Sequence, residues 1–203
     1  MPTVRANNID IYYEESGPAD APVILLVMGL GTQMIAWPED MIQGLVAQGF
    51  RVIHYDNRDV GLSQRMDGAP APNLIWTMVK ARVGLPTRAA YTLTDMMQDG
   101  IALLDALGIA KAHIAGASMG GMIAQVMTIE HPTRVRTLTS VMSMSGEPEY
   151  GQSAPEAMTA LLSVPPPPPK LSVIPPPPPG LPPPPPEKLA MSLLENPCLL
   201  VLL

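Results

Sequence analysis

Short continuous runs of apolar residues alternate along this chain with stretches in which apolar residues recur every three or four positions. A continuous run predicts a buried strand, and the run at 23–27 is typical of a strand buried on both faces of a parallel sheet. Helical recurrence predicts amphipathic helices. The predicted strands are 4–8, 9–14, 23–27, 51–55, 112–115 and 135–142, and the predicted helices begin near Pro38, Thr92 and Met119. Strands alternating with helices in this way indicate an α/β fold.

Local signals set the ends of these helices. Pro38 followed by two acidic residues is typical of a first helical turn, and Gly49 is a C-terminal stop signal. Thr92 with Asp95 three residues later predicts a capping box, and Gly108 ends that helix. The apolar stripe expected on the first helix is Met41, Ile42, Leu45 and Val46.

A glycine-flanked serine joins the strand at 112–115 to the helix at 119–130. Gly116, Ser118 and Gly120 have the spacing G-x-S-x-G. A serine in a strained strand-to-helix turn needs small neighbours, because the two backbones pass closely. Such a turn exposes Oγ above the sheet and puts the positive end of the helix beside a reacting carbonyl. For the pentapeptide alone, a glycine-rich turn without chemistry is the alternative.

Three motifs in order resemble those of the α/β-hydrolase superfamily, over roughly residues 3–145. The glycine turn at 28–31 stands where that superfamily has its oxyanion loop, and 55–63 resembles its D-x-R-x-x-G-x-S turn. Ser118 then falls at the nucleophile elbow. Within the superfamily the chain looks most like small serine esterases and methylesterases whose loop has M-G-x-x-x in place of H-G-x-x. The resemblance implies a mostly parallel sheet with helices on both faces.

The resemblance also implies a division of roles. Ser118 would be the nucleophile, and the backbone N–H groups of Leu30 and Met119 would form the oxyanion hole. Each such donor can be worth about 3 kcal/mol in the transition state. Gly29 and its neighbour Gly31 would keep the Leu30 amide accessible. The expected reaction is hydrolysis of an uncharged, small or medium carboxylic ester through an acyl-enzyme, with no cofactor and no metal ion.

The remaining residues that carry the resemblance are given no catalytic role. Asp56, Arg58 and Ser63 are interpreted as structural residues that hold a loop near the rim of the site. Ser118, where haloalkane dehalogenases and epoxide hydrolases need a carboxylate, disfavours those two reactions.

The sequence predicts no partner for Ser118 in a catalytic triad. In this superfamily the acid and then the histidine follow the nucleophile, after the late strands. His131 is the one histidine after Ser118, but a helix of thirteen residues would place it roughly 20 Å away. His54 and His113 lie inside predicted strands and are interpreted as packing residues. Glu147 follows a strand where some members carry the acid, and we assign it no role without its histidine.

Beyond residue 145 the composition changes. Five-proline runs occupy 165–169, 175–179 and 182–186, and these can form only polyproline II or loop. The predicted organisation is a hydrolase core at 1–145, a proline-rich segment in the cap position at 146–188, and a helix end with a late core strand at 189–203. That last stretch resembles the strand before the family's acid, so the chain is expected to be C-terminally incomplete. The proline runs favour a linker over a ligand for SH3 or WW domains.

Charge and cysteine content exclude several classes of partner. The net charge of −6, with no basic run, argues against nucleic acid. No secretory signal and no apolar stretch of about 20 residues is apparent, so no membrane span is expected. A single cysteine, Cys198, fits a reducing cytoplasm. The oligomeric state is left open.

Two other functions stay open at this stage. One is a hydrolase-like module that has lost catalysis and binds a ligand or partner. The other is a cofactor-free haloperoxidase-like activity on the same fold.

Overall fold

The computed structural model describes residues 2–66, 89–146, 154 and 156. By contacts the chain divides into two compact units, Met1–Gly151 and Gln152–Leu203, and the account below concerns the first. The proline runs, the expected late strand at 189–203, Glu147 and Cys198 lie outside the described residues.

The described residues form one sheet whose strands run in the order β1-β2-β4-β3-β5-β6. The strands are β1 (Thr3–Ala6), β2 (Ile9–Ser16), β3 (Val23–Val27), β4 (Arg51–Tyr55), β5 (Ala112–Ala117) and β6 (Val135–Val141). The helices are η1 (Met34–Ala36, a 3₁₀ turn), α1 (Glu39–Ala47), α3 (Leu93–Ala106) and α4 (Met119–Glu130). β1 pairs antiparallel with β2 and β2 with β4, whereas the pairs β3–β4, β3–β5 and β5–β6 are parallel. The expected α/β fold with a mostly parallel sheet is confirmed.

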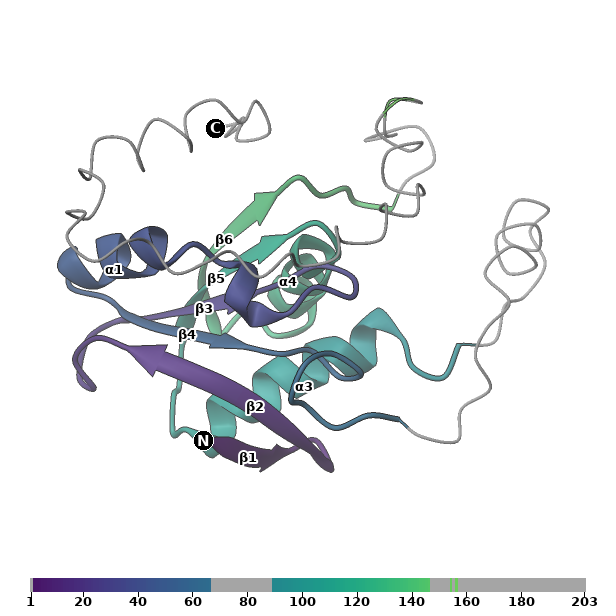
Figure 1. Cartoon of the computed structure of the whole chain (residues 1–203), viewed down its shortest axis with the longest axis horizontal. Helices are drawn as coiled ribbons and strands as arrows, with labels where there is room; N and C mark the ends of the chain where they lie inside the picture. The colour runs from purple at the N-terminus through teal and green to yellow at the C-terminus, as the bar shows by residue number, and fades with distance from the viewer. Residues whose placement is uncertain (1, 67–88, 147–153, 155, 157–203) are drawn as a thin grey trace, which may run out of the picture. The chain divides into compact units, whose positions relative to one another are not determined.

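Helices cover both faces of the sheet, with α1 on one side and α3 and α4 on the other (Figure 1). Alternate residues of each strand face opposite sides. Leu25 and Ile53 pack with α3 and α4, while Leu26 and Val52 pack with Ile42 of α1. All five residues of β3 are buried, as its continuous apolar run predicts.

The turns follow local chemistry. Asn7 and Asn8, both with positive φ (46° and 62°), close the β1–β2 hairpin, as a tight two-residue turn requires. The predicted capping box of α3 is present: the Asp95 N–H donates to Thr92 Oγ1 at 3.2 Å, and the Thr92 N–H donates to Asp95 Oδ2 at 2.7 Å. Hence the first turn of α3 is fixed from both directions.

Three details of the structure differ from the expectation. The first strand, expected at 4–8, is β1 at Thr3–Ala6, because Asn7 and Asn8 form the turn to β2. The stripe expected on α1 is narrower, because Met41 is 37% exposed and only Ile42 is fully buried. The short turn η1 carries no periodic signal of its own and was not predicted. Among the helices within the described ranges, none is long and apolar enough to cross a membrane.

Candidate active site

Ser118 occupies the sharp turn between β5 and α4. Its backbone has φ 55° and ψ −123°, a conformation that residues with a Cβ rarely adopt. The Ser118 N–H donates to the Val141 carbonyl of β6 at 2.8 Å, which ties the turn to the neighbouring strand. The residue is exposed, and its side chain makes no capping hydrogen bond to α4. Within the described residues the hydroxyl has no hydrogen-bond partner, and it lies at the N-terminus of a helix.

The two glycines of the pentapeptide are needed for backbone packing. A Cβ on Gly116 would collide with the carbonyl oxygen of Gly120, the second residue of α4. A Cβ on Gly120 would collide with the carbonyl oxygen of Val27, at the end of β3. Any larger residue at either position would push α4 away from the sheet. These contacts supply the close approach that the spacing G-x-S-x-G implies, whereas the catalytic role of the turn stays a prediction.

Strand register brings the glycine loop after β3 to the same place. Val27 pairs with Gly116 across the parallel strands β3 and β5, so Gly29 and Ser118, each two residues further on, are neighbours. A Cβ built on Gly29 would lie 3.0 Å from the Ser118 Cβ and 3.5 Å from its Oγ. Gly29 therefore packs directly against the serine side chain, where a larger residue would crowd the hydroxyl.

The amides assigned to the oxyanion hole flank this contact. Residues 29–32 form a turn in which the Thr32 N–H donates to the Gly29 carbonyl at 3.3 Å, and Gly31 has φ +64°. This turn leaves the Leu30 N–H without a main-chain acceptor in the part of the chain that the structure describes. The Met119 N–H is the first amide of α4, and such amides have no acceptor within the helix. Neither amide has a main-chain acceptor among the described residues, and their role as oxyanion donors stays a prediction.

The turn after β4 holds the loop after β3. Asp56 accepts hydrogen bonds from the Met34 N–H at 2.8 Å and from the Leu62 N–H at 2.9 Å. Ser63 Oγ donates to the Asp56 carbonyl at 2.6 Å and accepts from the Tyr12 N–H at 2.9 Å. These bonds agree with the structural role expected of Asp56 and Ser63.

Asn57 belongs to the same turn, and sequence reasoning gave it no role. Its side-chain amide donates to the Met28 carbonyl at 2.8 Å. The available signal was a polar pair, Asp56 and Asn57, following a buried strand, because a buried amide needs partners.

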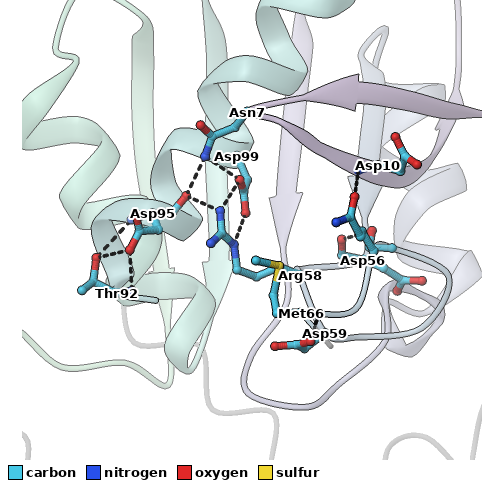
Figure 2. Close-up of polar contacts among 11 residues, drawn as sticks. Asn7, Asp10, Asp56, Arg58, Asp59, Met66, Thr92, Asp95 and Asp99 are labelled. Carbon is cyan, nitrogen blue, oxygen red and sulfur yellow. Dashed lines mark hydrogen bonds and ion pairs between the residues drawn. The ribbon is translucent and has the colours of Figure 1, made fainter. Parts of the chain in front are cut away.

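Arg58 anchors the turn to α3 (Figure 2). Its Nε and Nη2 each lie 2.7 Å from an oxygen of Asp99, and both side chains are buried. The hydrogen bond with Asp99 raises the pKa of Arg58. Asn7 of the β1–β2 turn also donates to Asp99, at 2.8 Å, so one carboxylate joins three parts of the fold. The Arg58 guanidinium also lies 5.1 Å from the centre of the Tyr91 ring.

None of the three histidines of the sequence lies at the elbow. His131 caps the far end of α4, with its Nε2 3.3 Å from the Gln98 side chain. His113, partway along β5, bonds Thr137 at 2.8 Å and packs against Phe50. His54 is buried within β4. The interpretation of His54 and His113 as packing residues agrees with these positions, and no histidine of this chain is placed to act as the general base for Ser118.

Comparison with known proteins shows which family this chain belongs to. The family model for the alpha/beta hydrolase fold matches residues 22–166. Rhodomycin D methylesterase DnrP of Streptomyces peucetius is 33% identical over 145 residues, which are 70% of this chain and 42% of that protein. RutD of Variovorax paradoxus (strain S110), provisionally assigned as a carbamate hydrolase, is 30% identical over 152 residues, 75% of this chain and 49% of that protein.

Among solved structures, the enol-lactonase from Burkholderia xenovorans LB400 is similar with a TM-score of 0.57 and 27% identity. That similarity covers 79% of this chain and 54% of the lactonase chain. The chain therefore spans only about half the length of the relatives it matches, or somewhat less.

Proposed function

Because this chain belongs to the α/β-hydrolase fold family, we propose that it carries the nucleophile and oxyanion hole of a serine hydrolase acting on carboxylic esters. One observation carries the proposal. The exposed Ser118 hydroxyl stands on a strained turn at the start of α4, with Gly29 packed against it. A protein that used this turn only for folding would gain nothing from holding a serine in that conformation.

The reaction follows from the groups around Ser118. Oγ attacks the ester carbonyl carbon, and the carbonyl oxygen becomes an oxyanion that accepts hydrogen bonds from the Leu30 and Met119 N–H groups. The Ser118 hydroxyl proton passes to solvent as Oγ attacks. The tetrahedral intermediate then expels the alkoxide, which takes a proton from solvent and leaves as the alcohol, and the acyl group stays on Oγ. Water hydrolyses this acyl-enzyme. The N-terminus of α4 adds partial positive charge where the oxyanion forms.

The relatives support an ester as the substrate. One is a methylesterase and one solved neighbour is an enol-lactonase, so both of those proteins cleave an acyl–oxygen bond. The similarity to RutD favours a carbamate as the second candidate. An ester and a carbamate both offer a carbonyl carbon to Ser118. They differ in how readily that carbon is attacked and in the leaving group.

The proposal has a kinetic consequence, because no histidine of this chain lies beside Ser118. Serine hydrolases without a triad member retain about 10³-fold to 10⁴-fold catalysis over water from the oxyanion hole and binding. The 203-residue chain is therefore expected to acylate slowly, and faster as the pH rises, with no inflection near the ordinary histidine pKa of about 6.5. Added imidazole, which can accept the proton, should accelerate the step in proportion to its concentration.

The test is labelling of the full chain with a fluorophosphonate probe, followed by peptide mapping. We expect one adduct, on Ser118, whose rate of formation rises with pH and with imidazole. Ser118→Ala should abolish it, whereas Ser143→Ala, a control at a partly buried serine near Gly121, should not. An adduct on another residue, or none at any imidazole concentration, would contradict the proposal and favour the non-catalytic binding module.

A further inference from the structure

Two consecutive side chains at the end of β4 bind opposite ends of the loop after β3. This loop, residues 28–34, begins with the carbonyl that accepts from the Asn57 amide and ends with the N–H that donates to Asp56. Both supporting side chains are almost completely buried, Asp56 at 3% exposure and Asn57 at 1%. Two adjacent residues of one turn therefore fix both ends of a neighbouring loop.

The supporting turn is itself held in place. A Cβ on Gly61, which has φ +54°, would collide with the Asp56 carboxylate, so the chain folds tightly around that group. Ser63 joins the Asp56 backbone to Tyr12 of β2. Arg58, the residue after Asn57, is bound to Asp99 of α3. The turn that holds the 28–34 loop is therefore itself bonded to β2 and to α3.

The loop needs this support because of what it carries. Gly29 lies against the Ser118 side chain, and the adjacent Leu30 is 78% exposed. An oxyanion donor works when its N–H is already aimed before the charge develops. A glycine-containing loop with an exposed tip does not hold that aim by packing, so its ends have to be fixed by hydrogen bonds.

We propose that Asn57, with Asp56, is a positioning residue that holds the 28–34 loop so that Gly29 stays against Ser118 and the Leu30 amide stays available to the oxyanion. The inference rests on the proposed function for its chemical consequence. Its structural content, the holding of the loop, can be measured without any reaction. Asn57 is the more informative of the two, because its bond to the Met28 carbonyl is one residue from Gly29. Its own turn is closed by its backbone carbonyl, which accepts from the Val60 N–H at 3.1 Å and stays in place when the side chain is changed.

The experiment compares Asn57→Leu with the wild type in the full chain. Leucine has nearly the shape of asparagine and lacks the donor. Gln125→Met is the matched control, because it removes another side-chain amide, which donates to Ser140 Oγ at 3.1 Å and to the Met144 carbonyl at 3.3 Å, and among the described residues that amide has no bond to the 28–34 loop. Two measurements are made on each protein: amide hydrogen exchange at residues 28–36, and fluorophosphonate labelling over a range of probe concentrations.

In Asn57→Leu we expect the Thr32 and Met34 amides to exchange about tenfold faster, because the loop opens locally. The maximal labelling rate should fall about tenfold or more with the half-saturating probe concentration unchanged, since a donor for the transition state is misplaced. Gln125→Met should change neither beyond about twofold when each protein is measured at the same interval below its melting temperature. Asp56→Asn leaves one of the two N–H groups that donate to this side chain without its acceptor, so it should also speed exchange at the loop. This variant replaces Asn57→Leu if that protein does not fold.

The outcomes separate this inference from the proposed function. Unchanged exchange in the loop overturns the positioning role whether or not Ser118 reacts. An equal loss of labelling in Gln125→Met also overturns it, because the effect would then reflect general destabilisation. If Asn57→Leu speeds exchange in the loop but the wild type is never labelled, the role of Asn57 in holding the loop is supported and the proposed function is rejected.

Discussion

Ser118 is held in a backbone conformation that costs free energy. Its φ of 55° with ψ of −123° is disfavoured for any residue with a Cβ, and such strain costs on the order of 1–3 kcal/mol. The neighbouring contacts enforce it, because Gly116 and Gly120 lock β5 against α4 on either side. The energy lost at this residue is the structural argument for chemistry there, since a glycine would satisfy the same turn without strain.

This strain predicts that Ser118→Gly stabilises the protein. Glycine adopts positive φ without a steric penalty, and the Ser118 side chain makes no capping bond that would be lost. We expect the free energy of unfolding to rise by about 1 kcal/mol relative to Ser118→Ala, which keeps the Cβ and lacks the hydroxyl. In thermal unfolding this difference is about 2–4 °C for a domain of this size.

The comparison between these two variants is itself the control, because neither can form an acyl-enzyme at residue 118. Equal melting temperatures for the glycine and alanine variants would show that the turn is unstrained, and would remove the argument that the serine is held there at a cost.

The sequence predicted residue roles correctly where a steric rule applied. It did not predict contacts that depend on the register between strands. The packing demands on Gly116 and Gly120 follow from their spacing around Ser118. Asn57 could not be assigned, because its partner is the Met28 carbonyl, 29 residues away at the start of the loop after β3. That contact depends on how β4 aligns with β3, and an apolar run gives a strand without its register.

At the scale of elements, α3 connects the candidate site to the rest of the fold. It carries Asp99, which pairs with Arg58 next to Asn57, and its N-terminus is closed by Thr92 and Asp95 (Figure 2). Hydrogen bonds from Thr92, its backbone N–H first and its hydroxyl second, lower the pKa of Asp95 below its ordinary value of 3.8. The cap therefore stabilises the protein mainly when Asp95 is ionised.

This lowered pKa predicts a pH-dependent effect of Asp95→Asn. A carboxylate whose folded pKa is depressed contributes stability above its unfolded pKa, and that stability is lost as the pH falls through the folded pKa. At pH 7 the variant should be less stable by about 1 kcal/mol, the usual value of an N-cap interaction. The difference should shrink as the pH falls below 3.8.

Chemical denaturation at several pH values measures this, and Asp40→Asn, in the first turn of α1, serves as the control for an acid without a capping box. A difference between wild type and Asp95→Asn that stays constant down to low pH would mean that the cap does not depend on the ionised carboxylate.

Element boundaries were predictable where proline, glycine or a capping pair marks them. The strands β3 and β4 and the helix α4 begin and end where apolar runs and their flanking residues indicate. The apolar stripe of α1 was predicted too wide, because helical spacing alone does not say how much of that helix the sheet can cover. The turn η1 has a tertiary cause instead, since the N–H of its first residue, Met34, bonds Asp56.

At the scale of the whole molecule, the sheet has one strand with little cover. β6 lies at the end of the strand order in the described residues, and five of its seven residues are exposed. An edge strand leaves backbone groups unpaired along one side.

The chain also spans only 42% of the related methylesterase, and none of its histidines reaches Ser118. The proposal for this chain is therefore confined to a nucleophile, Ser118, and its oxyanion donors.

The most direct test of that claim is the site at which the full chain is acylated by a simple ester. After incubation with p-nitrophenyl acetate, peptide mass mapping should find the acetyl group on Ser118, accumulated because no base promotes its hydrolysis, and absent from Ser118→Ala. Acetyl groups on lysine side chains alone, in equal amounts in both proteins, would show that Ser118 does not act as a nucleophile and would contradict the account.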